Sequence, residues 1–196
     1  AVERANTAGR PLLAWLEAQA NLAGDATLAR GIHVVPEFLG NRAPHADPDA
    51  RAVIAGLDLE DDLDSLVRLY VAGLCGLAYG ARQIVEAMAA KGIVLQQIII
   101  SGGAAQSPLV RQIIADATGI EVAVAETPEP VLLGAAMLGA VAGKAYPALA
   151  EAMSGMSALG ATYAPGQSEI RDFHEKKFKV YEALQAAGRQ ARALMA

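Results

Sequence analysis

The sequence is poor in cysteine and in clustered basic residues, and each shortage excludes a class of function. Its only cysteine, Cys75, cannot form an internal disulfide, and the apolar helical stretch around it indicates a small buried thiol. A net charge of −5 and a pI near 5.2 argue against a nucleic-acid partner, because binding to phosphate backbones needs clustered lysine and arginine side chains.

Long apolar runs are also missing. No uninterrupted run approaches the roughly 20 residues that cross a bilayer, and the residues after Ala1 contain no basic segment leading into a signal core. We therefore expect a cytoplasmic protein. The three histidines, His33, His45 and His174, have no ligand spacing with one another or with Cys75, so we assign no metal site to the chain.

What the chain has in excess is apolar surface. Hydrophobic residues make up 54% of its 196 residues, and the mean hydropathy of +0.30 is high for a domain with a complete surface of its own. This length suits one domain or a part of a larger two-domain protein. We therefore expect some apolar surface of this chain to contact another piece of protein.

Apolar periodicity predicts a helix-rich chain with a few short strands. The predicted helices cover residues 11–19, 64–91, 107–119, 131–142 and 173–195, and the predicted strands cover residues 32–35, 98–100 and 122–124. Residues 36–57 contain three prolines and are predicted to be mostly loop, in which Asp47 or Asp49 caps a short helix. Lys176, Lys177 and Lys179 are predicted to form a solvated face of the last helix.

The segment 93–126 is the most informative part of the chain. Residues 98–100 are an isoleucine run bounded by glycines, which predicts a buried strand. Ser107 followed by Pro108 predicts a helix start, with a hydroxyl cap and a proline in the first turn. The order of strand, glycine turn, helix and strand predicts a βαβ unit with a parallel, sandwiched sheet.

The turn Ser101-Gly102-Gly103 is the candidate binding element. Glycine permits positive φ and leaves no Cβ between the backbone and a ligand. Backbone N–H groups and the positive end of a helix dipole favour an anion such as a phosphate oxygen. The pattern also fits a simple tight βα turn. It is neither a Walker loop, because no Gly-Lys-Ser/Thr follows, nor the Gly-x-Gly-x-x-Gly dinucleotide fingerprint.

The segment ISGGAAQSPLVRQIIADATGIEV resembles the hallmark of the FGGY family of carbohydrate kinases, in which a Gly-Gly turn, a Ser/Asn-Pro helix start and an IIADxTG helix precede a short strand. Three other segments are similar to that family's upstream loop, small-residue helix and closing helix: FLGNRAPHADPDARAVIAGL, PEPVLLGAAMLGAVAGKAYPALAEAM and FHEKKFKVYEAL. The sequence Leu69-Tyr70-Val71-Ala72 has alanine where the broader signature has an acidic residue, and in this it resembles the D-ribulokinase-like branch of pentulose kinases.

The resemblance implies an α/β fold: a helix-rich, ribonuclease-H-like domain of the actin, hexokinase and Hsp70 superfamily, here with an incomplete sheet. Residues 1–196 are then the C-terminal, ATP-binding domain of a sugar kinase that uses ATP and Mg²⁺, and residues 171–196 are its closing helix. Gly102, Gly103 and Ala104 are implied to contact ATP phosphate or ribose through backbone groups, and Gln106 and Ser107 to lie by the nucleoside.

Three further residues are candidates. Thr7 and Gly9 belong to a segment in the place where the family lines the other side of the adenine pocket. Arg42, in GNRAP, either braces the loop near the interdomain hinge or approaches phosphate. A third interpretation is that Arg42 ties down the proline-rich loop through Asp47 or Asp49.

The family's catalytic aspartate and most of its sugar contacts lie in an N-terminal domain, so we expect no catalytic residue in this chain and no phosphorylation by the chain alone. The missing domain or a partner chain is expected to cover the exposed sheet edge, with a homodimer as an alternative. D-ribulose, ribitol and xylulose remain open as substrates. A non-sugar ATPase of the actin-like superfamily and a non-catalytic or regulatory module with the same fold are the other readings.

Overall fold

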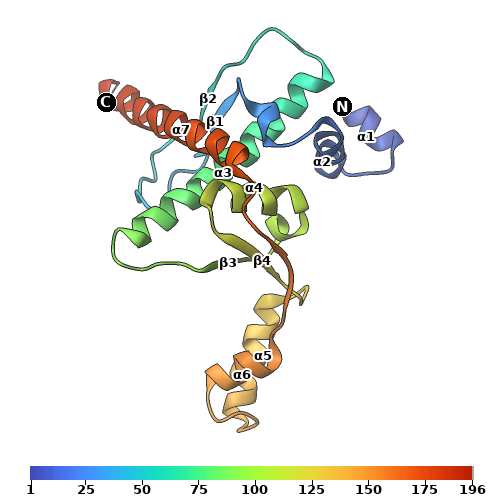
Figure 1. The fold of residues 1–196 in the computed structure, drawn as a ribbon, viewed down its shortest axis with the longest axis vertical. Helices are drawn as coiled ribbons and strands as arrows, with labels where there is room; N and C mark the ends of the chain where they lie inside the picture. Colours follow the sequence, from blue (N-terminus) through green and yellow to red (C-terminus); the bar gives the residue numbers. More distant parts are fainter. Residues whose placement is uncertain (196) are drawn as a thin grey trace.

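The 27-residue helix α3 (Leu63–Ala89) is the centre around which most other elements are arranged (Figure 1). The structure is a computed structural model that describes residues 1–195, without the side chain of Ala104. Helix α4 (Pro108–Thr118) and the short 3-10 helix η1 (Ala26–Ala29) pack against α3, as do strand β1 (His33–Val35) and α2 (Leu12–Ala23). Asp62 caps α3 by accepting a hydrogen bond from the Ser65 N–H at 2.8 Å.

The remaining elements complete the chain in sequence order. They are α1 (Val2–Thr7), β2 (Val53–Ala55), β3 (Gln97–Ile100), the 3-10 helix η2 (Gly103–Gln106), β4 (Glu121–Ala125), α5 (Pro130–Ala142), α6 (Leu149–Met156), β5 (Leu159–Tyr163) and α7 (Ser168–Leu194). The long helices are therefore close to their predicted bounds, whereas α1, β2, α6 and β5 were not predicted.

The predicted βαβ unit is confirmed. Strands β3 and β4 are parallel, with Ile98 opposite Val122, and α4 connects them. The predicted start of α4 is also correct, because the Ser107 hydroxyl accepts from the Val110 N–H at 3.1 Å and Pro108 is the first helical residue. Gly119 ends the helix with φ +70°, a left-handed conformation that favours glycine.

The sheet differs from the prediction in two respects. Strand β5 adds antiparallel to β4, so the strand order is β3-β4-β5. The prediction that the isoleucine run is a buried strand is wrong: Ile99 is 58% exposed, and Ile98 and Ile100 are only partly buried where they pack against the core. The physical reason is strand alternation, since α4 covers one face of this sheet and successive side chains point to opposite faces. The second sheet is a separate antiparallel pair, β1 with β2.

Helix α3 and strand β1 approach each other closely at Gly76. A Cβ atom at this position would overlap the backbone carbonyl oxygen of Val34. Gly73, one turn earlier in the same helix, has open space where its Cβ would stand. The contact at Gly76 therefore requires glycine, whereas Gly73 is not required by packing.

Gly76→Ala is expected to destabilise the chain by about 1–3 kcal/mol, because the added methyl group forces backbone apart in a packed interface. Gly73→Ala is the matched control and is expected to stabilise the chain by about 0.5–1 kcal/mol, since alanine is the better helix former. Urea denaturation of both variants measures the two effects. Equal stability of the two variants would contradict the close approach of α3 and β1.

The prediction that Lys177 lies on a solvated helix face is wrong. Lys177 is 5% exposed, and its ammonium donates to the backbone oxygens of Ile32, at 2.6 Å, and Ala29. Lys176 and Lys179 are exposed as predicted. The reason lies in helical spacing, because residues 173, 177 and 181 form one face of α7 and all three are buried in the core.

A cluster of polar and aromatic side chains lies between α3 and α7. The Tyr79 hydroxyl and His174 Nδ1 are 2.9 Å apart and hydrogen-bonded, and both side chains are buried. Burial lowers the pKa of His174 to about 4, so this histidine is neutral at pH 7. Cys75 is fully buried, as predicted, and burial raises the pKa of its thiol to about 12.

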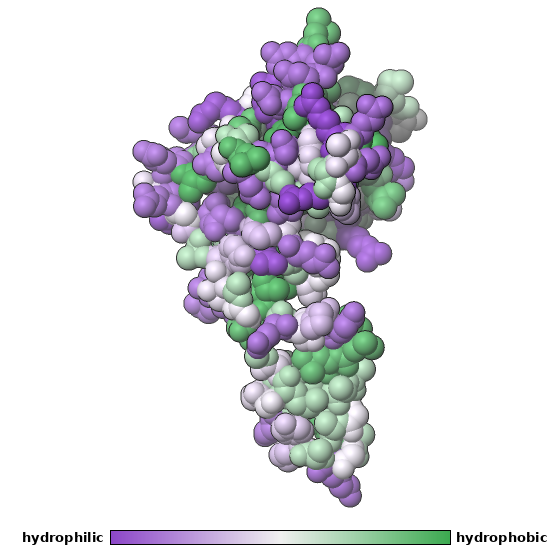
Figure 2. Space-filling view, turned by 90° about the vertical axis from the view of Figure 1, so that its right-hand side faces the viewer, coloured by the Kyte–Doolittle hydropathy of each residue, from purple (hydrophilic) through white to green (hydrophobic). Residues whose placement is uncertain are grey.

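Helices α5 and α6 form a hairpin that projects from the rest of the chain, at the bottom of Figure 1. Figure 2 shows that apolar residues dominate the surface of this projection. On α5 Val131 is 82% and Leu132 65% exposed, and on α6 Met153 is also exposed. A helix that is apolar on all sides is normally buried against other protein. The exposed side chains of this hairpin therefore form an apolar surface of the kind that the high hydrophobic content of the sequence led us to expect. None of the helices in residues 1–195 is long and apolar enough to cross a membrane.

Candidate functional site: a pocket beside the glycine turn

A pocket of about 250 Å³ lies at the carboxyl ends of the parallel strands β3 and β4. Two strand-to-helix junctions meet there, because parallel strands end at the same edge of a sheet. The first junction is the glycine turn, and the second is the segment between β4 and α5. The pocket is lined by Ile100, Ser101, Gly102, Ala105, Gln106, Arg111, Val124, Ala125, Glu126, Thr127, Pro128 and Pro130.

The glycine turn is open on the side where a ligand would approach. Gly102 has φ +75° and ψ −155°, a conformation that is essentially restricted to glycine. Gly103 begins η2, and nothing lies within 4 Å of the position that a Cβ would take at either glycine. The turn therefore has both features that the sequence predicted for an anion site: positive φ and unobstructed backbone.

Gln106 and Ser107 take different positions at the end of the turn. Gln106 is exposed and lines the pocket. The Ser107 hydroxyl is already engaged, since it donates to Glu17 Oε1 at 2.6 Å and accepts from the Val110 N–H. The structure thus gives Ser107 a capping role, with Glu17 of α2 as its partner. The side chain of Ala104 lies outside what the structure describes.

Arg111 lines the pocket and was missed in the sequence. Its Nε donates to the Ala105 carbonyl at 2.6 Å, Nη2 donates to the same oxygen, and Nη1 donates to the Tyr163 hydroxyl at 2.8 Å. The guanidinium carbon also lies 5.3 Å from the centre of the Tyr163 ring. The signal for Arg111 was its position in the sequence, four residues after the helix cap Ser107. A helical side chain points back over the preceding turn, which for Arg111 is the first turn of α4 beside the pocket.

The second wall of the pocket was also missed. Glu126, Thr127 and Pro128 lie between β4 and α5, Pro130 is the first residue of α5, and all four line the pocket. The signal was present in the sequence, since a polar, proline-containing segment directly follows the second strand of the βαβ unit. Among the described lining residues, Arg111 is the cation and Glu126 the carboxylate.

Of the predicted site residues, Gly102 and Gln106 line this pocket, whereas its lining among residues 1–195 does not include Gly103, Ser107, Thr7, Gly9 or Arg42. The Thr7 hydroxyl donates to the Glu3 carbonyl at 2.8 Å within α1. Gly9 follows the end of α1 with φ +63°. The role assigned to Thr7 and Gly9 at the adenine therefore stays a prediction.

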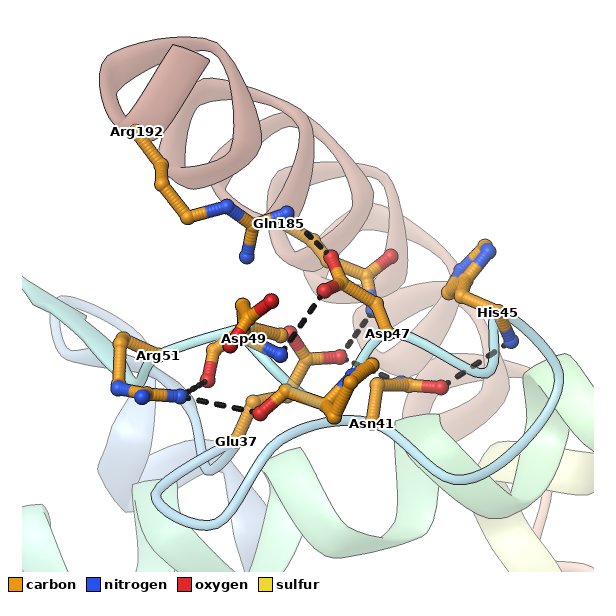
Figure 3. A network of polar contacts seen from close by, with 10 residues as sticks. Glu37, Asn41, His45, Asp47, Asp49, Arg51, Gln185 and Arg192 are labelled. Atoms are coloured by element: carbon orange, nitrogen blue, oxygen red, sulfur yellow. Dashed lines mark hydrogen bonds and ion pairs between the residues drawn. The ribbon is translucent and has the colours of Figure 1, made fainter. Parts of the chain in front are cut away.

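Arg42 belongs to a loop that lies against α7, and its side chain is exposed. The prediction that Asp47 or Asp49 caps a short helix is wrong, because residues 41–52 contain no helix. Figure 3 shows what holds this loop instead: Asp47 pairs with Arg192 of α7 at 2.6 Å and accepts from the Asp49 N–H. An arginine does tie down the loop, but it is Arg192.

A buried network secures the start of the same loop. The Glu37 Oε1 atom accepts from Asn41 Nδ2, at 2.5 Å, and from Gln185 Nε2, at 2.6 Å (Figure 3). Gln185 also accepts from Gln83 of α3 at 2.9 Å. The loop is therefore hydrogen-bonded to α7 through Gln185 and linked by the same side chain to α3, and these contacts hold it in place.

A glycine turn and a capped helix beside a parallel strand pair place this part of the chain among α/β domains, in many of which ligands bind at the carboxyl ends of the strands. Comparison with known proteins then gives the family. Residues 2–143 match the model of the FGGY family of carbohydrate kinases, C-terminal domain, and the chain belongs to this family.

Relatives within the family carry different names. An FGGY carbohydrate kinase domain-containing protein of Xenopus laevis is 38% identical over 168 residues, which cover 86% of this chain and 30% of the relative. A glycerol kinase of Shewanella amazonensis is 33% identical, with 72% and 30% covered. A D-ribulokinase of Saccharomyces cerevisiae is 31% identical, with 61% and 17% covered. The chain thus spans about a third or less of the length of these relatives.

Solved structures show the fold. A ligand-bound xylulose kinase from Lactobacillus acidophilus has a TM-score of 0.76 at 19% identity, with 92% of this chain and 36% of that one covered. A glycerol kinase from Plasmodium falciparum with ADP has a TM-score of 0.68 at 24% identity, with 87% and 33% covered. The predicted fold is therefore confirmed as that of the actin- and hexokinase-like kinases, ribonuclease-H-like and helix-rich with small sheets.

Proposed function

We propose that this chain is the ATP-binding part of a carbohydrate kinase that transfers the γ-phosphate of ATP to a sugar hydroxyl. The observation that carries the proposal is the pocket beside Gly102 and Gly103, in a chain that belongs to a family of carbohydrate kinases. The backbone of the two glycines is open to a phosphate oxygen, and the helix α4 behind the turn adds the positive end of its dipole.

The nucleoside is proposed to lie along the second wall. Val124, Pro128 and Pro130 offer apolar surface there, and the Glu126 carboxylate can accept hydrogen bonds from ribose hydroxyls. A pocket of about 250 Å³ is smaller than sites that enclose a whole ligand of drug size. The rest of the nucleotide is therefore proposed to contact the other domain of a complete kinase.

Magnesium is proposed to enter with the nucleotide. Among the described residues, no group of three or more His, Cys, Asp or Glu side chains could hold a metal ion. Mg²⁺ keeps several waters and is commonly bound through substrate phosphates with one or two carboxylates. Glu126 is the carboxylate of this pocket, and Mg²⁺ would supply charge neutralisation at the β- and γ-phosphates.

Phosphoryl transfer also needs a carboxylate that orients or deprotonates the attacking hydroxyl. The pocket is proposed to hold the nucleotide only, and this carboxylate and the sugar contacts are proposed to belong to the remaining part of the kinase. That part is also proposed to cover the apolar hairpin of α5 and α6, since these side chains are otherwise exposed to water.

The substrate is proposed to be a pentulose such as D-ribulose. Ala72, at a position where the broader family signature is acidic, and the match to a yeast D-ribulokinase support this choice. Glycerol and xylulose kinases match as well. Activity of a full-length kinase that contains this chain should therefore be compared on D-ribulose, D-xylulose and glycerol, and a preference for glycerol would contradict the pentulose proposal.

The proposal is tested on the isolated chain by thermal unfolding with Mg-ATP. At a ligand concentration of 100 times Kd, binding adds about 2.7 kcal/mol of stability, which corresponds to a Tm increase of roughly 5–10 °C for a chain of this length. A coupled assay with the three sugars should detect no turnover by the chain alone. A constant Tm at millimolar Mg-ATP would leave the non-catalytic module as the better interpretation, and sugar turnover by the chain would contradict the division of roles.

A further inference from the structure

One side chain connects the glycine turn to two other elements. Arg111 lies on the second turn of α4, and two of its N–H groups converge on the Ala105 carbonyl of η2. A third N–H reaches the Tyr163 hydroxyl at the end of β5, whose ring lies beside the guanidinium. Arg111 therefore holds the nearby Ala105 and Tyr163, which is 52 positions further along the chain, in one arrangement at the edge of the pocket.

From this arrangement we infer that Arg111 is a positioning residue for the phosphate end of the nucleotide. The inference rests on the proposed function, because it assigns a role within the same pocket. Arg111 fixes η2 before the ligand arrives, and its charge raises the local positive potential where phosphate binds.

The turn needs such support because of its composition. It contains two adjacent glycines, and glycine loses more conformational freedom on ordering than any other residue. Within η2 the Ala105 N–H donates to the Gly102 carbonyl at 3.1 Å, and a four-residue 3-10 turn provides few hydrogen bonds of its own. Ordering one residue costs about 1–2 kcal/mol. A turn that is already ordered in the free protein spares the ligand this cost, which strengthens binding.

The geometry requires arginine and not only a positive charge. A planar guanidinium can place two N–H groups on one carbonyl and a third on the Tyr163 hydroxyl at the same time. Lysine carries the same charge on a single nitrogen and cannot maintain this fork. The substitution Arg111→Lys therefore separates the positioning role from a purely electrostatic one.

Calorimetric titration of the 196-residue chain with Mg-ATP and with adenosine tests the inference. In Arg111→Lys and Arg111→Gln the Kd for Mg-ATP is expected to rise about tenfold or more, since the turn must then be ordered on binding. The Kd for adenosine, which lacks phosphates, is expected to change less than about twofold. Arg171→Gln, an exposed arginine of α7, is the matched control and should bind both ligands as the unmodified chain does.

Amide hydrogen exchange of residues 103–106 in the free chain provides a second readout. Exchange there is expected to be faster in Arg111→Lys and in Tyr163→Phe, which keeps the ring and removes the hydroxyl. Normal Mg-ATP affinity in Arg111→Lys, an equal loss of affinity for ATP and adenosine, or unchanged exchange at residues 103–106 would overturn the inference. Failure of the unmodified chain to bind Mg-ATP would overturn the proposed function instead, and the exchange measurement would still decide whether Arg111 orders the turn.

Discussion

Gly103→Val is expected to abolish the stabilisation of this chain by Mg-ATP while changing the stability of the free chain little. Gly103 is exposed, and its Cβ would meet nothing within 4 Å, so a valine fits without a clash in the free chain. The branched side chain would, however, stand where a phosphate oxygen approaches the backbone. A loss of about 2.7 kcal/mol of ligand stabilisation, at 100 times the original Kd, is the expected size of the effect.

Two other glycines show whether the effect is specific to the pocket. Gly31→Val is the matched control, because Gly31 is also exposed with open space at its Cβ, and neither of its sequence neighbours lines the pocket, whereas Gly103 directly follows the lining residue Gly102. It should retain the full response to Mg-ATP. Gly102→Val should differ from both by destabilising the free chain by about 1–3 kcal/mol, since its backbone conformation is restricted to glycine. A normal Tm shift in Gly103→Val would contradict the assignment of the turn.

Lys177→Met is expected to destabilise the chain more at pH 10 than at pH 7. Burial lowers the pKa of the Lys177 ammonium to about 8, below its value of 10.5 in an exposed side chain. Between these two values the unfolded chain binds the proton more tightly, so the contribution of Lys177 to stability increases as the pH rises. Below about pH 8 Lys177 is charged in both the folded and the unfolded chain, so folding includes the full free-energy cost of burying its ammonium group.

The difference in unfolding free energy between the unmodified chain and Lys177→Met should therefore grow by about 2 kcal/mol from pH 7 to pH 10. At high pH the neutral amine still donates to the carbonyls of Ala29 and Ile32, and methionine cannot. Urea denaturation at several pH values measures this difference. Lys176→Met, on the exposed side of the same helix, should show a small and constant difference. A difference for Lys177→Met that does not vary with pH would be inconsistent with a buried ammonium.

The elements that follow from local rules could be predicted from the sequence. Ser107, Pro108 and Gly119 specify the two ends of α4, because cap, first-turn and C-terminal positions each have their own chemical requirement. The parallel pairing of β3 and β4 followed from the order of elements. The glycine turn was placed correctly because only the backbone of one short segment had to be considered.

Features that depend on contacts between distant segments could not be predicted. Arg192 and Asp47 form an ion pair although they are 145 positions apart in the sequence. No local sequence pattern shows that Arg192, and not Arg42, is the arginine that pairs with this loop. Lys177 is buried because its face of α7 packs on η1 and β1, which a charge run does not reveal. Strand β5 consists of mostly exposed residues and therefore lacks the apolar alternation by which strands are recognised.

The central claim is that the pocket beside Gly102 and Gly103 binds the nucleotide, and amide chemical-shift mapping with Mg-ATP tests it most directly. The account predicts saturable shifts that cluster at residues 101–106 and 124–130, the two junctions that line the pocket. A larger pocket between α1 and the start of α3 is lined by the acidic residues Asp58, Glu60, Asp61, Asp62 and Asp64. Shifts that centre on this acidic surface, or no shifts at millimolar Mg-ATP, would contradict the account.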